Sequence, residues 1–222
     1  MTPVEHVDER SWTVVVVGGG ALSARATAAA TSVGHGAVIA ADSGLDHAIA
    51  AGLRPTHLVG DLDSISATGR MWAYAHGLAI DEHPTAKDLT DTELALTAAA
   101  AARADGLLVV GGVGDRLDHL LGVLLALGGS AAAMFSDVRA IIGDNEFIVV
   151  HAHHRHELRL EPGRTFSVLS LHGDCRGVQV HGARWELDGT DLAATEARGL
   201  SNVADGTVSI ALDHGTLTVV IP

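Results

Sequence analysis

The stretch Leu89 to Val110, LTDTELALTAAAAARADGLLVV, joins an alanine-rich segment to a short apolar run and decides the fold class. The consecutive alanines Ala98 to Ala102 have high helix propensity and small side chains, which suit close packing on a sheet. They predict a helix over Leu89 to Arg103, and the run Leu107 to Val110 predicts a buried strand. A helix that leads into a buried strand is typical of a parallel sheet with crossover helices.

The same alternation extends over the first two thirds of the chain. It predicts further strands at Thr13 to Val17, Ala37 to Ala41, His57 to Val59 and Ala132 to Phe135, and further helices at Ser66 to His76 and Leu117 to Leu127. We therefore expect an α/β fold, with a doubly wound, mainly parallel sheet in a domain of residues 1–150.

After about Val150 the apolar segments become short and alternating, and Pro, Gly and Asp mark turns between them. Thr165 to Leu171, Thr207 to Leu212 and Thr216 to Ile221 are predicted strands, and Asp213-His214-Gly215 is predicted to close a hairpin between the last two. Residues 151–222 are thus expected to form a smaller all-β, sandwich-like domain.

Composition excludes several classes of protein. The net charge of -13 argues against a nucleic-acid binder, because no basic stripe could neutralise a run of phosphates. The longest uncharged apolar run, Leu120 to Phe135, is too short for a membrane span. A single cysteine, Cys175, and an acidic N-terminus without the apolar core of a signal peptide predict a cytoplasmic protein.

Three acidic motifs follow separate predicted strands. They are Gly60 to Ser64, Lys87 to Glu93 and Gly114 to His119. A doubly wound fold gathers such strand ends at one edge of the sheet, where ligands bind. Mg²⁺ prefers carboxylate and phosphate oxygens, while Lys and Arg offset the remaining phosphate charge, so the motifs predict phosphoryl or diphosphoryl transfer.

Each motif also has a purely structural explanation. Asp61 and Asp63 are two apart and could face one ion, but Asp63 with Ser64 could instead cap the helix that begins near Ser66. Asp88 and Asp91 are predicted to share one face at a helix start, where capping alone could explain them.

Arg116, Asp118 and His119 begin another predicted helix after a glycine-containing loop. Arginine there matches bidentate phosphate recognition, and an exposed surface arginine is the alternative. Gly18-Gly19-Gly20 after the first strand could approach phosphate or simply form a tight turn, and no GxxxxGK[ST] motif of P-loop enzymes occurs.

In the second half, Trp185 could fill a small core or form a platform for a flat or cationic ligand, with Ser201 and Asn202 as hydrogen-bonding partners. The histidines His151, His153, His154 and His156 could suggest a transition metal, although alternation in an exposed strand or linker explains them without an ion.

Taken in order, these motifs resemble those of the thiamine pyrophosphokinase family. Ala41 to Gly44 is similar to its DGG segment, Pro55 to Ser64 to PDxxxGDxDS, Lys87 to Ala95 to KDxTDxExA, and Gly111 to His119 to the loop ending in GGRxDH. Gly182 to Leu187 resembles its GxxWxL stretch and Gly199 to Asn202 its GxSNE. The sequence departs from the family at Ser43, Thr56, Asp115 and Val203.

The resemblance implies Mg²⁺-dependent transfer of diphosphate from ATP to the hydroxyl of thiamine, in a homodimer with active sites between subunits. It implies that residues 1–150 bind ATP and Mg²⁺ and that residues 151–222 bind thiamine. The implied metal ligands are Asp61, Asp63 and Asp91. The implied catalytic and phosphate-binding residues are Lys87, Asp88, Thr90, Arg116, Asp118 and His119, with Asp42 in the same cleft. The implied thiamine contacts are Trp185, Ser201 and Asn202.

Two other functions stay open at this point. The same transfer could act on another hydroxymethyl heterocycle, such as a pterin. Alternatively, the chain could be a non-catalytic nucleotide- or thiamine-binding sensor, with Asp115 and Val203 as relics of lost activity.

Overall fold

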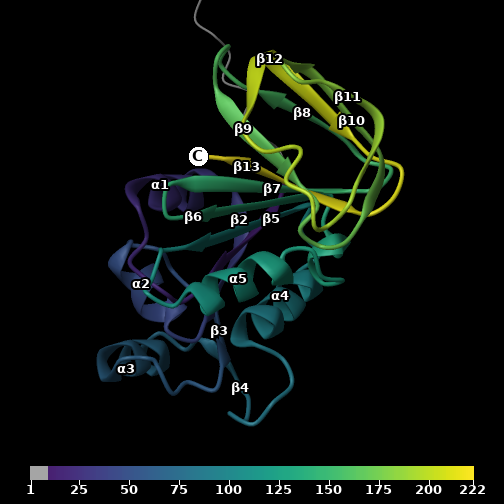
Figure 1. Ribbon diagram of the computed structural model, residues 1–222. Helices are drawn as coiled ribbons and strands as arrows, with labels where there is room; N and C mark the ends of the chain where they lie inside the picture. The colour runs from purple at the N-terminus through teal and green to yellow at the C-terminus, as the bar shows by residue number, and fades with distance from the viewer. Residues whose placement is uncertain (1–9) are drawn as a thin grey trace, which may run out of the picture.

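The computed structural model describes residues 10–222, so the acidic stretch 1–9 that contributed to the predicted location lies outside the described residues. A central parallel sheet has the strand order β4-β3-β2-β1-β5-β6 (Figure 1). Its strands are β1 (Trp12–Val16), β2 (His35–Ala41), β3 (His57–Gly60), β4 (Ala79–Glu82), β5 (Gly106–Gly111) and β6 (Asp137–Ile142). The order reverses between β1 and β5, which creates the crevice where ligands bind in such folds.

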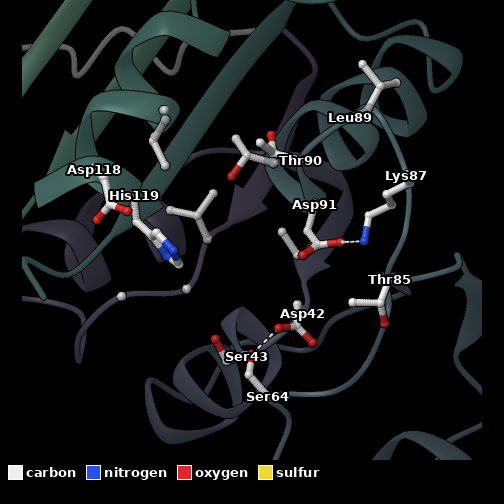
Figure 2. Close-up of a pocket in the computed structure, with 17 residues that line it drawn as sticks. Asp42, Ser43, Ser64, Thr85, Lys87, Leu89, Thr90, Asp91, Asp118 and His119 are labelled. Carbon is white, nitrogen blue, oxygen red and sulfur yellow. Dashed lines mark hydrogen bonds and ion pairs between the residues drawn. The ribbon is translucent and has the colours of Figure 1, made fainter. Parts of the chain in front are cut away.

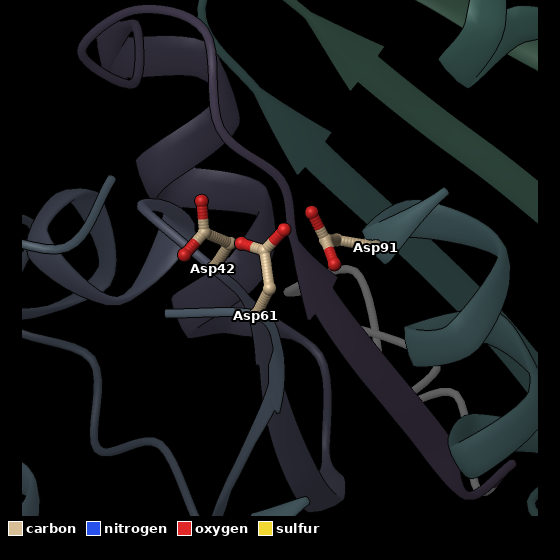
Figure 3. A group of neighbouring side chains, drawn as sticks. All are labelled: Asp42, Asp61 and Asp91. Carbon is tan, nitrogen blue, oxygen red and sulfur yellow. The ribbon is translucent and has the colours of Figure 1, made fainter. Parts of the chain in front are cut away.

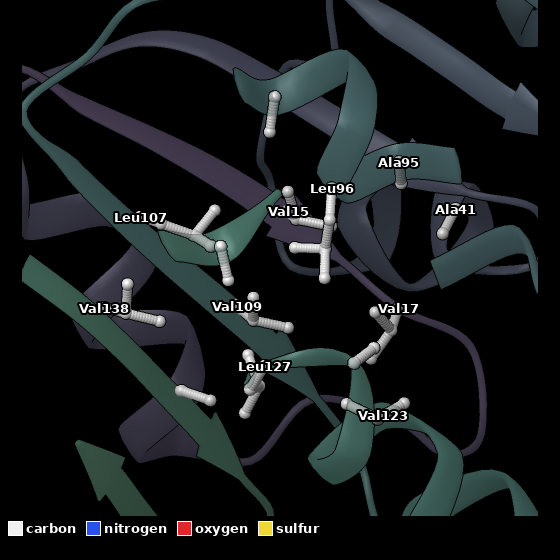
Figure 4. Close-up of a cluster of buried hydrophobic side chains, with 14 of the residues drawn as sticks. Val15, Val17, Ala41, Ala95, Leu96, Leu107, Val109, Val123, Leu127 and Val138 are labelled. Atoms are coloured by element: carbon white, nitrogen blue, oxygen red, sulfur yellow. The ribbon is translucent and has the colours of Figure 1, made fainter. Parts of the chain in front are cut away.

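Helices cover both faces of this sheet because successive strand residues point to opposite sides. Val15 and Val17 of the first strand region pack with Leu96 of α4 (Asp91–Ala101) and Val123 of α5 (Leu117–Ala126) (Figure 4). On the other face, Val14 and Val16 pack with helices α1 (Ala24–Ser32) and α2 (Gly44–Ala50), and α3 (Ala67–Ala75) lies beside α2. The predicted doubly wound architecture is confirmed.

The antiparallel strand β7 (Asn145–His151) joins the two halves of the molecule. Its side chains alternate between two cores, since Phe147 and Val149 pack in the α/β core while Ile148 and Val150 pack in the all-β core. The last strand, β13 (Thr216–Ile221), pairs with β7 and with β9 (Thr165–Leu169). The predicted boundary after residue 150 thus falls at the end of a strand whose sheet continues into the second half.

The remaining strands form the second layer of the all-β half, which lies at one end of the molecule (Figure 1). They are β8 (Arg155–Arg159), β10 (Cys175–Ala183), β11 (Leu187–Leu192) and β12 (Asn202–Ala211), with β12 pairing β10, β8 and the start of β9. Phe166, Val180 and Ile210 are among the fully buried side chains between the layers. The expected sandwich-like half is therefore present.

Two predicted elements are wrong. Ala132–Met134 forms a 3₁₀ turn, and the next strand is β6 at Asp137–Ile142, whose Asp137 and Arg139 obscured the apolar pattern. The segment Asp213 to Gly215 does not close a hairpin, because β12 and β13 belong to different layers and do not pair. Among residues 10–222, no helix is both long and apolar enough to cross a bilayer.

Candidate active site

A pocket of about 350 Å³ lies at the carboxyl ends of β1, β2 and β3, next to the amino ends of α4 and α5 (Figure 2). It brings together six of the residues predicted from sequence: Asp42, Lys87, Thr90, Asp91, Asp118 and His119. Ser43, Ser64 and Thr85, which the sequence did not single out as ligand contacts, also line it. Residues that are more than 70 positions apart in the chain thus share one strand-end cleft, as a doubly wound sheet dictates.

Three carboxylates form an acidic cluster at this pocket (Figure 3). Asp42 and Asp91 line the pocket, and Asp61 lies beside them, outside the lining. One oxygen from each lies within 4.8 Å of the others, and no other group of possible metal ligands occurs among the described residues. Asp42 follows β2, Asp61 follows β3 and Asp91 begins α4. The cluster presents hard oxygen donors at a separation that one divalent cation can bridge.

Asp42 is the most buried member of the acidic cluster, and the residue is only 8% exposed to solvent. One of its oxygens accepts a hydrogen bond from the Ser64 hydroxyl, while Oδ1 is buried without a partner. Burial raises the pKa of Asp42, and the neighbouring Asp91 and Asp61 add to that increase. A buried carboxylate oxygen without a donor is costly on its own and suits a cation that completes it.

Lys87 offsets the charge of the other two carboxylates. Its Nζ lies 3.2 Å from Oδ2 of Asp61 and 2.9 Å from Oδ1 of Asp91, and its side chain is only 14% exposed. Burial alone would lower the pKa of Lys87, but hydrogen bonds and charge from Asp91 and Asp61 raise it above its usual value. Lys87 is the only lysine in the sequence, and this composition is itself a signal for function.

The start of α4 shows that the Asp91 carboxylate is not used to cap the helix. Thr90 is the N-cap, and Thr90 and Glu93 form a reciprocal capping box in which each side chain accepts from the other's backbone N–H. Capping therefore does not explain Asp91. The expected shared helix face of Asp88 and Asp91 is wrong, because the helix begins at Asp91 and Asp88 is an exposed loop residue outside the pocket lining.

Asp63 and Ser64 do not cap α3. Ser66 is the N-cap, and its hydroxyl accepts from Gly69 N at 2.9 Å while Asp46 accepts from its backbone N–H. Asp63 is exposed and lies outside the acidic cluster, although its backbone N–H points to Asp61 Oδ1 at 3.4 Å. Ser64 turns into the pocket and contacts Asp42.

Gly60, the last residue of β3, lets the acidic cluster assemble. Its φ is +145°, and a Cβ at this position would lie 3.0 Å from Asp91 Oδ1 and 3.1 Å from Asp42 Cβ. Both the backbone conformation and the close approach require glycine here. The glycine is part of the Gly60 to Ser64 motif, but its packing role depends on the fold.

We expect Gly60→Ala to lower the free energy of unfolding by about 1–3 kcal/mol through backbone strain, and to weaken divalent-metal binding by pushing Asp42 and Asp91 apart. The matched control is Gly52→Ala, because Gly52 also has positive φ (+75°) but has open space around its Cβ. Chemical denaturation and Mn²⁺ titration of both variants measure the two effects. Equal metal affinity in both variants would contradict the close-approach argument.

Arg116 is placed differently from the prediction. It is exposed, does not line the pocket, and forms a bidentate ion pair with Asp118 through Nε–Oδ1 at 2.9 Å and Nη2–Oδ2 at 2.6 Å. Hydrogen bonds and charge from Arg116 hold the pKa of Asp118 well below its usual range. Among the described residues, Arg116 forms its hydrogen bonds and ion pair with Asp118. The guanidinium is therefore paired with Asp118 and not with Asp115.

The glycine turn after β1 is tightly packed and also borders the pocket. Gly18 and Gly19 line the pocket. A Cβ on Gly18 would lie 2.5 Å from Ser43 Oγ, and one on Gly20 would lie 2.7 Å from the Val113 carbonyl oxygen. The turn is therefore tight for packing reasons, and it also leaves backbone exposed to the pocket.

A second cavity of about 460 Å³ lies in the all-β half and contains Trp185 and Asn202. Trp185 is 56% exposed, with the Arg184 guanidinium 5.5 Å from the ring centroid. Trp185 does not fill a core, which leaves the platform hypothesis. Ser201 is exposed and does not line this cavity.

Asn202 has a role that the sequence did not predict. Its Oδ1 accepts from Trp185 N at 3.1 Å and from Val203 N at 2.8 Å, and its Nδ2 donates to the Trp185 carbonyl at 2.7 Å. The buried amide therefore holds the Trp185 backbone, and Asn202 also lines the cavity. It is a positioning residue for the exposed ring.

Two family models match the chain. Residues 33–135 match the model described as thiamin pyrophosphokinase, catalytic domain, and residues 153–217 match that described as thiamin pyrophosphokinase, vitamin B1 binding domain. No curated protein matches the chain in sequence.

Solved structures of similar fold include thiamine pyrophosphokinase from Bacillus subtilis, with a TM-score of 0.79, 23% identity, and coverage of 96% of this chain and 98% of that chain. The enzyme from Candida albicans has a TM-score of 0.74, 12% identity, and coverage of 96% and 89%. The yeast enzyme has a TM-score of 0.71, 14% identity, and coverage of 97% and 87%. At these low sequence identities, the structural similarity supports only the fold. Membership of the family rests on the two family models.

Proposed function

Because the chain belongs to the thiamin pyrophosphokinase family and is therefore a thiamine diphosphokinase-type transferase, we propose that it uses Mg²⁺ and ATP, with the acidic cluster as its metal site. The observation that carries this proposal is the group of Asp42, Asp61 and Asp91 beside Lys87 in the strand-end pocket. The reaction is transfer of the terminal diphosphate of ATP to the thiamine hydroxyl, which releases AMP.

The residues present fit a divalent cation. Asp42 Oδ1 is buried without a partner, and the three carboxylates offer only hard oxygen donors. Mg²⁺ held there would neutralise phosphate oxygens and make the β-phosphorus more electrophilic. Asp42 replaces Asp63 in the ligand set that we propose, since Asp63 lies outside the cluster. The role of Asp63 implied by the resemblance stays a prediction without support from this geometry.

The chain itself supplies orientation and charge. Lys87 places a cation at the pocket wall, where it can pair with phosphate oxygens as negative charge develops on the transferred group. Gly18 and Gly19 leave backbone open to the pocket, and α4 directs its positive dipole end there. Positioning and electrostatics account for most of the rate of such transfers.

Asp118 and Asp88 are the two candidates for the general base. Asp118 lines the pocket but is held ionised by Arg116, which makes it a weak base. Asp88 is exposed and outside the lining. His119 also lines the pocket, and we propose that His119 and Asp118 contact the nucleotide, while Arg116 holds Asp118 through their ion pair.

The two cavities support the proposal of a homodimer. Within one chain, the strand-end pocket and the Trp185 cavity have no lining residue in common, so they are separate cavities. Trp185 and the α5 residues Leu117, Leu121 and Leu125 are exposed, which leaves apolar surface for a second copy. A thiamine ring system stacked on Trp185 of one subunit would face the acidic pocket of the other. A cytoplasmic location and the absence of nucleic-acid binding stay predictions.

AMP formation with different acceptors tests the function. We expect AMP when ATP and Mg²⁺ are supplied with thiamine, and little with a hydroxymethylpterin, because the exposed Trp185 ring suits the cationic thiazolium. AMP with the pterin alone would select the rival substrate class. AMP with neither acceptor, at protein concentrations that bind both substrates, would contradict any transferase role.

We expect Asn202→Ala to raise the KM for thiamine about 5-fold, since losing the hydrogen bonds that fix Trp185 costs on the order of 1 kcal/mol. The KM for ATP and kcat should change little, because the acidic pocket is separate. Steady-state kinetics with each substrate varied measures this. Ser201→Ala is the control, and an equal rise in the KM for thiamine there would argue against the positioning role of Asn202.

A further inference from the structure

The loop from β3 into α3 contains a residue with unusual backbone geometry. Leu62, between Asp61 and Asp63, has a φ of +61°, in the left-handed region that a leucine rarely adopts. Such a conformation is costly and persists only where the surrounding structure holds it in place. Contacts from outside this short segment must therefore stabilise the turn.

The left-handed turn decides which aspartate reaches the acidic cluster. In extended backbone, residues two apart point to the same side, so Asp61 and Asp63 would face one ion together. A left-handed residue between them breaks this alternation. Asp61 accordingly turns toward the other two members of the acidic cluster (Figure 3), while Asp63 is exposed outside it.

The buried side chain of Leu62 supplies one restraint on the turn. It is only 1% exposed and packs with Leu45 of α2 and Leu58 of β3 in a small core. Burial of a leucine side chain is favourable, so this packing opposes the cost of the left-handed backbone. A glycine would adopt the same φ freely but would give up this anchor.

Arg70 on α3 supplies a second restraint, on the Leu62 backbone. Arg70 Nη2 donates a hydrogen bond to the Leu62 carbonyl oxygen. Within residues 10–222, no carboxylate forms an ion pair with this guanidinium, so its charge strengthens the hydrogen bond to the carbonyl. Because the direction of the carbonyl depends on the ψ angle of Leu62, the bond holds the turn in its left-handed form.

The start of α3 is itself fixed, so Arg70 reaches Leu62 from a defined position. Asp46 of α2 accepts hydrogen bonds from the Ser66 backbone N–H at 2.8 Å and from the Ser66 hydroxyl at 2.5 Å. A Cβ on Gly69 would overlap Asp46 Oδ1, so glycine allows α2 and α3 to approach this closely. The first turn of α3 is therefore held against α2.

We propose that Arg70 is a positioning residue for the metal site: through the Leu62 carbonyl, it holds the turn that directs Asp61 into the acidic cluster. The inference rests on the proposed function, because it takes Asp61 as a metal ligand. Arg70 lies outside the lining of the strand-end pocket, so it acts on the cation through the backbone of Leu62 and Asp61. Loss of Arg70 should loosen Asp61 and leave α3 folded, since Ser66 still caps the helix.

Mn²⁺ titration of the nucleotide-free full chain, with the variant Arg70→Met, tests the proposal. Methionine keeps much of the apolar stem and removes the hydrogen-bond donor. We expect the affinity for Mn²⁺ to fall about 10-fold, as is typical when a metal ligand loses the group that orients it. Arg70→Lys keeps a cationic donor and should recover part of this loss.

Arg54→Met is the matched control, because it makes the same change of charge. Arg54 is exposed in the α2–β3 loop, and no described residue forms a hydrogen bond or ion pair with its side chain. It should bind Mn²⁺ as the wild type does. Thermal unfolding of each variant checks that it is folded.

A double-mutant cycle separates a role through Asp61 from a general loss of structure. If Arg70 acts through Asp61, adding Arg70→Met to Asp61→Asn should weaken the residual Mn²⁺ binding no further. In kinetics, Arg70→Met should raise the Mg²⁺ concentration needed for half-maximal AMP release. The KM for thiamine should stay unchanged, because the Trp185 cavity shares no lining residue with the strand-end pocket.

The outcomes distinguish a failure of this inference from a failure of the proposed function. Absence of Mn²⁺ binding in the wild type, or wild-type binding in Asp61→Asn, would contradict the metal site and the inference with it. Two results would overturn the role of Arg70 alone, once Mn²⁺ binding is shown to depend on Asp61. One is wild-type affinity in folded Arg70→Met, and the other is an equal loss from Arg70→Met with and without Asp61→Asn.

Discussion

Asp91→Asn is expected to lower kcat by on the order of 10³-fold, because it removes one of the three carboxylates that we propose to hold the cation and weakens the ion pair that positions Lys87. The fold should survive. Thr90 and Glu93 still cap α4, so the loss of charge at the first helical residue costs only about 0.3–1 kcal/mol of helix-dipole interaction. AMP release from ATP and thiamine measures kcat, and thermal unfolding measures stability.

Asp63→Asn is the matched control for this variant. Asp63 has the same side chain, two residues after Asp61, and the resemblance implied it as a ligand, but it lies outside the acidic cluster. We expect near-normal turnover. A severe loss of turnover in Asp63→Asn, together with a mild loss in Asp91→Asn, would show that the metal site has been assigned to the wrong carboxylates.

Lys87→Met is expected to lower kcat by about 10²–10³-fold, since methionine keeps much of the packing but removes the cation proposed to pair with phosphate. Without metal, the variant should also lose about 3 kcal/mol of unfolding free energy, because Asp61 and Asp91 remain together and uncompensated. Added Mg²⁺ should raise the melting temperature more in the variant than in the wild type.

The pH dependence of this stability difference follows from the two pKa shifts. Burial would raise the pKa of Asp61, but Lys87 lowers it below the value in the unfolded chain. The stabilisation from this shift is present above the pKa of the unfolded carboxyl group and disappears as pH falls through the pKa of the folded one. The raised pKa of Lys87 contributes below the unfolded lysine pKa and is lost only in strong alkali. Metal-free wild type and Lys87→Met should therefore differ at neutral pH and converge in acid. A constant difference down to strong acid would contradict the ion-pair explanation.

Lys87 also offers a direct chemical probe, because it is the only lysine in the chain. An amine-acylating reagent can modify only its Nζ and the α-amino group. Saturating ATP with Mg²⁺ should protect Nζ from the reagent if Lys87 faces bound phosphate.

Much of the α/β half could be predicted from sequence because its strands and helices carry strong local patterns. The run Leu107 to Val110 and the alanines of α4 each indicate one element without reference to the rest of the chain. The strand at Asp137–Ile142 was missed since Asp137 and Arg139 form their own ion pair, which makes a charged pattern compatible with a sheet. Which strands pair in the second half depends on layer geometry that local pattern does not contain.

The candidate site, like the fold, could be predicted from sequence only in part. Motif positions at strand ends were enough to indicate a convergent pocket, and Asp61, Lys87 and Asp91 meet there. Sequence could not choose between Asp42 and Asp63, because the choice depends on the positive φ of Asp42 (46°) and on the close approach at Gly60. Nor could it show that the Asn202 amide binds the Trp185 backbone, since that contact joins the β10–β11 turn to the start of β12, 17 positions away.

The most direct test of the central claim is ³¹P NMR of the wild-type chain with ATP, thiamine and Mg²⁺. The acidic cluster and Lys87 as arranged here predict AMP and thiamine diphosphate in equal amounts, and no product when EDTA removes the metal. Formation of ADP and thiamine monophosphate, or undiminished thiamine diphosphate in EDTA, would contradict it.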